Sequence, residues 1–222
     1  MGGTGKSQLY QLLELADSSA SARVEILYRL KFLRGPKWLA NLRVHIYDFA
    51  DIYIDPLAAI IITILIFAWK ETAARLCFLF LASLIAYLRW LKIQRNNNVK
   101  DAMARKDKAN SLITENSALL LPYVGSVFDF EARYAEKLLS DVEQTRVDMY
   151  VFTEIDNLEY VFDKSRAGLI EDGYVIRAVK IFLARADNVG FARAASRLVK
   201  KGRYNEEFKD TVSELLALAK GR

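Results

Sequence analysis

The sequence predicts an all-α protein in which a transmembrane helical hairpin is joined to a cytoplasmic helical domain. Three observations lead to this fold class. Two uncharged apolar runs lie close together in the first half of the chain, the surrounding segments repeat apolar residues at helical spacing, and no segment has the clear alternation of a strand. The chain has 222 residues, of which 53% are hydrophobic and 27% charged, and its 3 prolines leave room for long helices.

Residues 1–48 are predicted to form cytoplasmic N-terminal helices. Residues 7–33 carry apolar positions at helical spacing, and Gly35-Pro36 breaks the chain after them. The next segment predicts an amphipathic helix that approaches the membrane, with five apolar positions on one side: Trp38, Leu39, Leu42, Ile46 and Phe49. This apolar side could lie in the membrane interface or pack against the C-terminal domain, and both interpretations stay open.

Residues 49–95 are predicted to form a two-helix transmembrane hairpin. The runs at 56–69 and 76–88 contain no charge. With their flanks they extend over 52–69 and 72–91, close to the roughly 20 residues that cross a bilayer core of about 30 Å. Aromatic residues typical of membrane interfaces flank both runs: Tyr53, Trp69, Tyr87 and Trp90. The alternative interpretation is a pair of buried core helices in a soluble protein.

The distribution of Lys and Arg predicts the orientation of this hairpin. Residues 89–108 contain seven of them, whereas residues 35–54 contain two and the connector at 70–75 contains two. The strongly basic side of a membrane hairpin stays in the cytoplasm. We therefore expect a multi-pass protein of the cell inner membrane with both termini cytoplasmic. The N-terminal segment does not resemble a secretory signal, because it contains no apolar core followed by a cleavage site.

Charged residues at the base of the hairpin form the first candidate functional site. Each arm carries charges of one sign on one helix face: Asp48, Asp51 and Asp55 on the first arm, and Arg89, Lys92 and Arg95 on the second. In an antiparallel hairpin folded at 72–73, Asp55 lies level with about Trp90, so the two faces can meet. The candidates are Asp51, Asp55, Arg89 and Lys92. They either pair and set the hairpin register, or form an acidic mouth that attracts cations or changes partners on activation.

Residues 96–222 are predicted to form the cytoplasmic helical domain. Asn96-Asn97-Asn98 marks the exit from the hairpin, and a charged helix is predicted over 99–121, before Pro122. A long helix follows, with Ser126 as a candidate N-cap and Gly168 as its end. Three shorter helices complete the domain: about 174–186, 190–200 and 205–220.

Charge is unevenly distributed along this domain. Residues 128–172 carry 12 Asp and Glu against 5 Lys and Arg, whereas residues 176–203 carry 8 Lys and Arg against one Asp. Three basic residues on one helix face form the second candidate site: Arg193, Arg197 and Lys200. They could pair with the acidic half of the domain, bind a nucleic-acid backbone, or bind anionic lipid or a protein partner.

The sequence predicts neither an enzyme nor a bound cofactor or metal. A single cysteine, Cys77, and a single histidine, His45, do not supply a disulfide, a Cys or His metal cluster, or an ordinary Ser-His-Asp triad. Gly5-Lys6-Ser7 resembles the end of a phosphate-binding loop, but the earlier glycine and the preceding strand are missing. We therefore expect no catalytic residues.

The hairpin layout, together with Asn-Leu-Glu-Tyr at 157–160 and Gly-Leu-Ile-Glu-Asp at 168–172, resembles the two-span membrane effectors encoded beside bacterial reverse transcriptases in retron anti-phage systems. These features cover under half of the chain and include no catalytic motif. The resemblance implies a toxin for abortive infection, which a reverse transcriptase and its DNA–RNA product hold silent. On release, homo-oligomers of the hairpin would perturb the membrane. A non-toxic membrane anchor that recruits a protein partner and a holin-like pore former are the alternatives.

Overall fold

The computed structural model describes residues 3–67, 72–116 and 140–220, and in these ranges it contains helices and no strand, which confirms the all-α prediction. No helix within the described residues is both long enough and apolar enough to cross a membrane. The helices are α1 (Gly3–Leu15), α2 (Ala20–Arg29), α3 (Lys37–Phe67), α4 (Thr72–Glu115), α7 (Asp141–Arg166), α8 (Asp172–Ala186), α9 (Val189–Lys201) and α10 (Glu206–Ala219).

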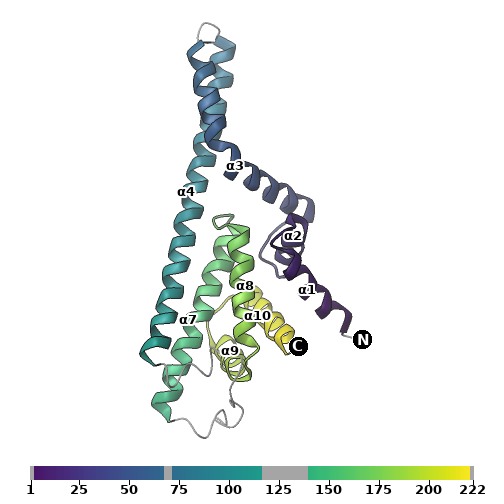
Figure 1. Ribbon diagram of the computed structural model, residues 1–222, viewed down its shortest axis with the longest axis vertical. Helices are drawn as coiled ribbons and strands as arrows, with labels where there is room; N and C mark the ends of the chain where they lie inside the picture. The colour runs from purple at the N-terminus through teal and green to yellow at the C-terminus, as the bar shows by residue number, and fades with distance from the viewer. Residues whose placement is uncertain (1–2, 68–71, 117–139, 221–222) are drawn as a thin grey trace.

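Helix α4 runs along most of the length of the molecule (Figure 1). Its first half pairs with the second half of α3 in a hairpin that projects beyond the body, and its second half packs against α7. Helix α3 changes direction between an oblique first half and the hairpin. Pro56 lies inside α3, where its ring and its missing N–H disrupt the helical hydrogen bonds, and this accounts for the bend.

Asn96-Asn97-Asn98, which the sequence marks as the exit from the hairpin, does not separate two helices, because α4 is continuous from Thr72 to Glu115. Asn98 is buried, and its side chain has partners on other elements. Its Nδ2 donates to the carbonyl of Leu169 at 2.8 Å, and its Oδ1 accepts a hydrogen bond from the Tyr160 hydroxyl at 3.0 Å. Tertiary hydrogen bonds thus satisfy a side chain that would otherwise compete with the helix backbone.

The predicted helical region over residues 7–33 is divided in two. Helix α1 ends at Leu15, and Ser19 begins α2 by accepting a hydrogen bond from the backbone N–H of Ala22 at 3.3 Å. Helix α2 ends where Lys31 adopts a φ of 61° and the N–H of Phe32 donates to the carbonyl of Leu27 at 2.8 Å. This turn allows the Phe32 side chain to be fully buried.

The long helix of the C-terminal domain ends where predicted. Gly168 adopts a φ of 73°, and the N–H of the following Leu169 donates to the carbonyl of Lys164 at 2.8 Å. At the other end, Ser140 and Glu143 form a capping box that begins α7. The predicted N-cap, Ser126, lies outside the described residues.

The three shorter helices are confirmed as α8, α9 and α10, within a few residues of their predicted bounds. Asn188 caps α9 by accepting hydrogen bonds from the N–H groups of Gly190 and Phe191, and Asn205 caps α10 by accepting one from the N–H of Phe208.

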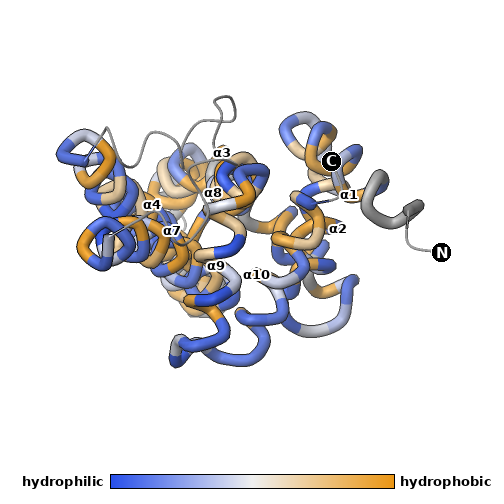
Figure 2. Tube along the Cα trace, turned by 90° about the horizontal axis from the view of Figure 1, so that it is seen from below, coloured by the Kyte–Doolittle hydropathy of each residue, from blue (hydrophilic) through white to orange (hydrophobic). Residues whose placement is uncertain are grey.

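The N-terminal helices and the C-terminal domain share one hydrophobic core. The Phe162 ring of α7 lies 5.1 Å from the ring of Phe32 and 5.5 Å from that of Phe208 on α10, measured between centroids. The buried Thr211 hydroxyl lies 3.1 Å from the carbonyl of Leu30, to which it donates. Seen from below (Figure 2), hydrophobic segments gather in α4, α7 and α8, while the loops at the rim are mainly hydrophilic.

We expect Phe162→Ala to lower the free energy of unfolding by about 3–5 kcal/mol, because it removes a fully buried ring that contacts both ends of the chain. Phe152→Ala, on the same helix but 49% exposed, is the matched control and should change it by less than about 1 kcal/mol. Denaturant unfolding of the two purified variants measures both values. Equal losses would contradict a core centred on Phe162.

Candidate functional site

The hairpin base brings together charges from both arms, as predicted. The Asp55 carboxylate lies 3.2 Å from the guanidinium of Arg89 and 3.5 Å from the Lys92 ammonium. The predicted pairing is therefore confirmed for Asp55, whereas the side chain of Asp51 lies outside the described residues. The Asp55 and Arg89 side chains are both more than half exposed, so solvent screens this cluster and its contribution to stability is small.

Small and apolar side chains form the contact between the two arms. Ala50, Ile54 and Ala58 are spaced by four residues on α3, and all are buried. On α4, Leu91 and the long side chain of Arg95 are also buried. The alanines permit close approach of the two backbones, whereas several of the larger apolar residues of the arms are exposed.

The outer surface of the hairpin is apolar and uncovered. Six large side chains on the two arms have exposed fractions between 44% and 71%: Ile60, Ile62, Ile64, Leu76, Leu79 and Phe80. Isolated exposed apolar residues are ordinary in folded proteins, but six on two neighbouring helices are typical of an interaction surface.

A second apolar surface follows the first half of α3, and we call it the α3 face. It comprises residues on one side of the helix with exposed fractions between 44% and 66%: Trp38, Leu39, Leu42, Ile46, Phe49 and Tyr53. The opposite side contacts the body, where Val44 is fully buried and Arg43 donates to the carbonyl of Ser165 at 2.8 Å. The α3 face therefore does not pack against the described residues of the C-terminal domain, and its placement in a membrane interface stays a prediction.

The three residues of the predicted basic face have different surroundings on α9. The Arg197 guanidinium pairs with the Asp148 carboxylate of α7 at 2.5 Å, so internal pairing holds for this residue. Arg193 and Lys200 are exposed. The part of the face that stays available to a partner is thus smaller than the sequence predicts.

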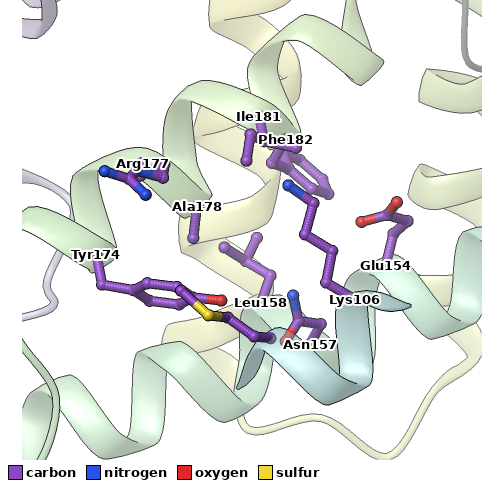
Figure 3. Close-up of a pocket in the computed structure, with 10 residues that line it drawn as sticks. Lys106, Glu154, Asn157, Leu158, Tyr174, Arg177, Ala178, Ile181 and Phe182 are labelled. Carbon is purple, nitrogen blue, oxygen red and sulfur yellow. The ribbon is translucent and has the colours of Figure 1, made fainter. Parts of the chain in front are cut away.

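A cavity of about 110 Å³ lies between α4, α7 and α8 (Figure 3). Its polar lining comes from all three helices: Lys106 of α4, Glu154 and Asn157 of α7, and Tyr174 and Arg177 of α8. Its remaining wall is apolar and includes Leu158 and Phe182. We call this space the three-helix cavity.

Two oxygen atoms in the three-helix cavity lack a hydrogen-bond donor, although the Glu154 carboxyl group also interacts with the Tyr150 hydroxyl. Glu154 is 6% exposed and Asn157 is 8% exposed, and among the described residues nothing donates to Oε1 of the first or Oδ1 of the second. Burial raises the pKa of Glu154, while the positive charges of Arg185 and Lys106 oppose that shift. A buried acceptor without a donor is energetically unfavourable, so both oxygen atoms lower the stability of the folded state.

This cavity was not among the sites predicted from sequence. One signal was present: Glu154 lies four residues from both Tyr150 and Leu158, so a carboxylate occupies the buried stripe of α7. The contributions of Lys106 and Arg177 carry no such signal, since single charged residues are common on helices and neither belongs to a motif.

The pairing of Asp55 with Arg89 can be measured by a double-mutant cycle with Asp55→Asn and Arg89→Gln. We expect a coupling energy of about 0.2–1 kcal/mol, because both side chains are more than half exposed. Thermal unfolding of the four purified proteins in detergent gives the coupling. A value of zero would show that this ion pair contributes nothing to the stability of the protein.

Glu154→Gln should stabilise the protein at pH 7. Because burial raises the pKa of Glu154 above its ordinary 4.5, the folded state favours the protonated form, and stability falls as the pH rises through 4.5 towards the raised pKa. Glutamine does not ionise, so the advantage should vanish at about pH 4. Glu143→Gln is the control. It should destabilise the protein at pH 7, because hydrogen bonds from Ser140 lower the pKa of Glu143. Unfolding midpoints at both pH values test this, and a destabilised Glu154→Gln at pH 7 would contradict it.

Comparison with known proteins assigns no family to this chain. No protein-family model, curated protein or solved structure matches it.

Proposed function

We propose that this chain is an inner-membrane effector of a bacterial anti-phage system of the retron type, which perturbs the membrane when released from inhibition. The observation that supports this proposal most is the uncovered apolar surface of the hairpin, including Ile62, Leu79 and Phe80. In water such a surface is unfavourable, and transfer of each large apolar side chain to an apolar environment is worth about 1.5–3 kcal/mol.

The proposed insertion uses both arms and the connector between them. The uncharged run of the first arm continues in the sequence to Trp69, two residues past the end of α3 at Phe67. The paired charges at Asp55 lie near the other end of that arm, at the level expected of the cytoplasmic boundary. Both termini then remain on the cytoplasmic side with the basic residues of α4.

The α3 face extends the proposed membrane contact beyond the hairpin. It ends at Tyr53, next to the base of the hairpin, and includes Trp38 and Phe49. Aromatic side chains favour the boundary between headgroups and acyl chains, where an amphipathic helix lies in the membrane plane. In this arrangement, α3 lies on the membrane with its first half and enters it with its second.

Inhibition by a reverse transcriptase and its DNA–RNA product is the part of the proposal that comes from the resemblance. Arg193 and Lys200 are exposed and could contact a nucleic-acid backbone, whereas Arg197 is held by Asp148. Release would let hairpins of several copies associate through their apolar outer surfaces.

The topology can be tested by cysteine labelling in a Cys77→Ser background. A membrane-impermeant maleimide should label Glu71→Cys, in the connector, from outside intact spheroplasts. It should label Ser213→Cys, at an exposed position of α10, only after the membrane is permeabilised. Labelling of both positions, or of neither, in intact spheroplasts would contradict a two-span hairpin with cytoplasmic termini.

The activity can be tested by inducible expression in a bacterial host, with membrane potential and viability as readouts. We expect the chain alone to depolarise the membrane and its genomic neighbours to suppress that effect. The double variant Ile62→Lys/Leu79→Lys should abolish depolarisation, because charges on the hairpin surface oppose insertion. Phe152→Lys, a charge at an exposed apolar position of the body, is the matched control and should retain activity.

The outcome also separates this proposal from a non-toxic anchor that recruits a protein partner. If the membrane potential is unchanged both with the chain alone and beside its genomic neighbours, and the protein is verified in the membrane, the same cells are challenged with phage. Depolarisation on infection supports a triggered effector, and its absence favours the anchor.

A further inference from the structure

The three-helix cavity has the composition of a binding site rather than of a packing defect. An empty packing defect is lined by apolar groups, whereas here five charged or polar residues from three helices line the same space: Lys106, Glu154, Asn157, Tyr174 and Arg177. Figure 3 shows the side chain of Lys106 extending toward Phe182, with the Glu154 carboxyl group to one side and Tyr174 to the other.

The unpaired acceptors of this cavity favour a ligand that donates hydrogen bonds. Oε1 of Glu154 and Oδ1 of Asn157 have no donor among the described residues, and both side chains are more than nine-tenths buried. They lie one helical turn apart on α7, so one cationic amine can approach both. An ammonium group carries three donors and a charge opposite to that of the carboxylate.

The cationic side chains of the cavity favour an acidic group on the same ligand. Lys106 and Arg177 lie on different helices and form no ion pair or hydrogen bond with another described residue. Arg177 is exposed, so it lies on the solvent side of the cavity, whereas Glu154 lies at its buried side. The two charges of a ligand would therefore be separated along the axis from the opening to the interior.

From this arrangement we infer that the three-helix cavity binds a small zwitterion of the α-amino acid type. Its ammonium group contacts Glu154 and Asn157, and its carboxylate contacts Lys106 and Arg177. The apolar wall at Leu158 and Phe182 receives the side chain. This inference does not depend on the membrane activity proposed above.

The volume of the cavity limits the size of the ligand. The space is small, about 110 Å³, and it is partly open to solvent. Glycine, alanine and serine are the smallest ligands of the inferred type and suit a small space better than a nucleotide or an aromatic amino acid does. The small amino acids are therefore the first probes.

Isothermal titration calorimetry of the full chain in detergent, with glycine, L-alanine and L-serine, tests the inference. We expect saturable binding of at least one of them. Propionate and ethylamine are matched probes that lack the amine and the carboxylate of alanine, and each should bind about ten-fold or more weakly than alanine. Absence of saturable binding for all three amino acids at millimolar concentration, or equal binding of a matched probe, overturns the inference.

Variants locate the binding site on the chain. Glu154→Gln and Arg177→Gln should each weaken amino-acid binding about ten-fold or more, because each removes one charged contact. Arg177 is exposed, so its variant should fold normally, as circular dichroism can verify. Lys108→Gln, two residues from Lys106 but exposed and lining a different groove, should leave the affinity unchanged. Unchanged affinity in both cavity variants excludes this cavity as the site.

Discussion

The continuity of α4 is the constraint on which the rest of this structure depends. One helix of 44 residues, about 66 Å long, forms an arm of the hairpin and a wall of the body. The hairpin base and the three-helix cavity therefore lie on the same rigid element, with Lys92 and Lys106 about 21 Å apart along its axis. A break at Asn98 would remove this connection, and the hydrogen bonds of Asn98 with Leu169 and Tyr160 stabilise the helix where its own sequence predicts an end.

The body is organised around α7, which contacts α4, α8 and α9. Aromatic residues extend these contacts to both ends of the chain, because Phe162 lies between Phe32 and Phe208. The N-terminal helices are thus part of the same core as the C-terminal domain. Burial of that core leaves two large apolar surfaces without cover among the described residues: the outer side of the hairpin and the α3 face. Both are adjacent to the hairpin base, so a single apolar environment could cover them together.

Some polar sites could be predicted from local sequence patterns, whereas others depend on contacts between distant parts of the chain. The pairing of Asp55 with Arg89 and Lys92 was predictable, because hairpin geometry alone brings those helix faces together. For the basic residues of α9, sequence charge balance suggested internal pairing as one alternative, but only the structure distinguishes Arg197, which pairs with Asp148, from the exposed Arg193. The three-helix cavity depends on how α4 and α8 pack against α7, and no local pattern specifies that arrangement.

The sequence by itself determined the helical class, the apolar hairpin region and most helix ends of the C-terminal domain. These features follow from local causes: apolar periodicity, Asn caps at 188 and 205, and a glycine at 168 that adopts a positive φ. Tertiary structure alone decided the continuity of α4, the exposure of the α3 face and the burial of Glu154 without a hydrogen-bond donor at Oε1. Each of these depends on contacts between residues far apart in the chain, whose free energies exceed the local preferences that a sequence pattern records.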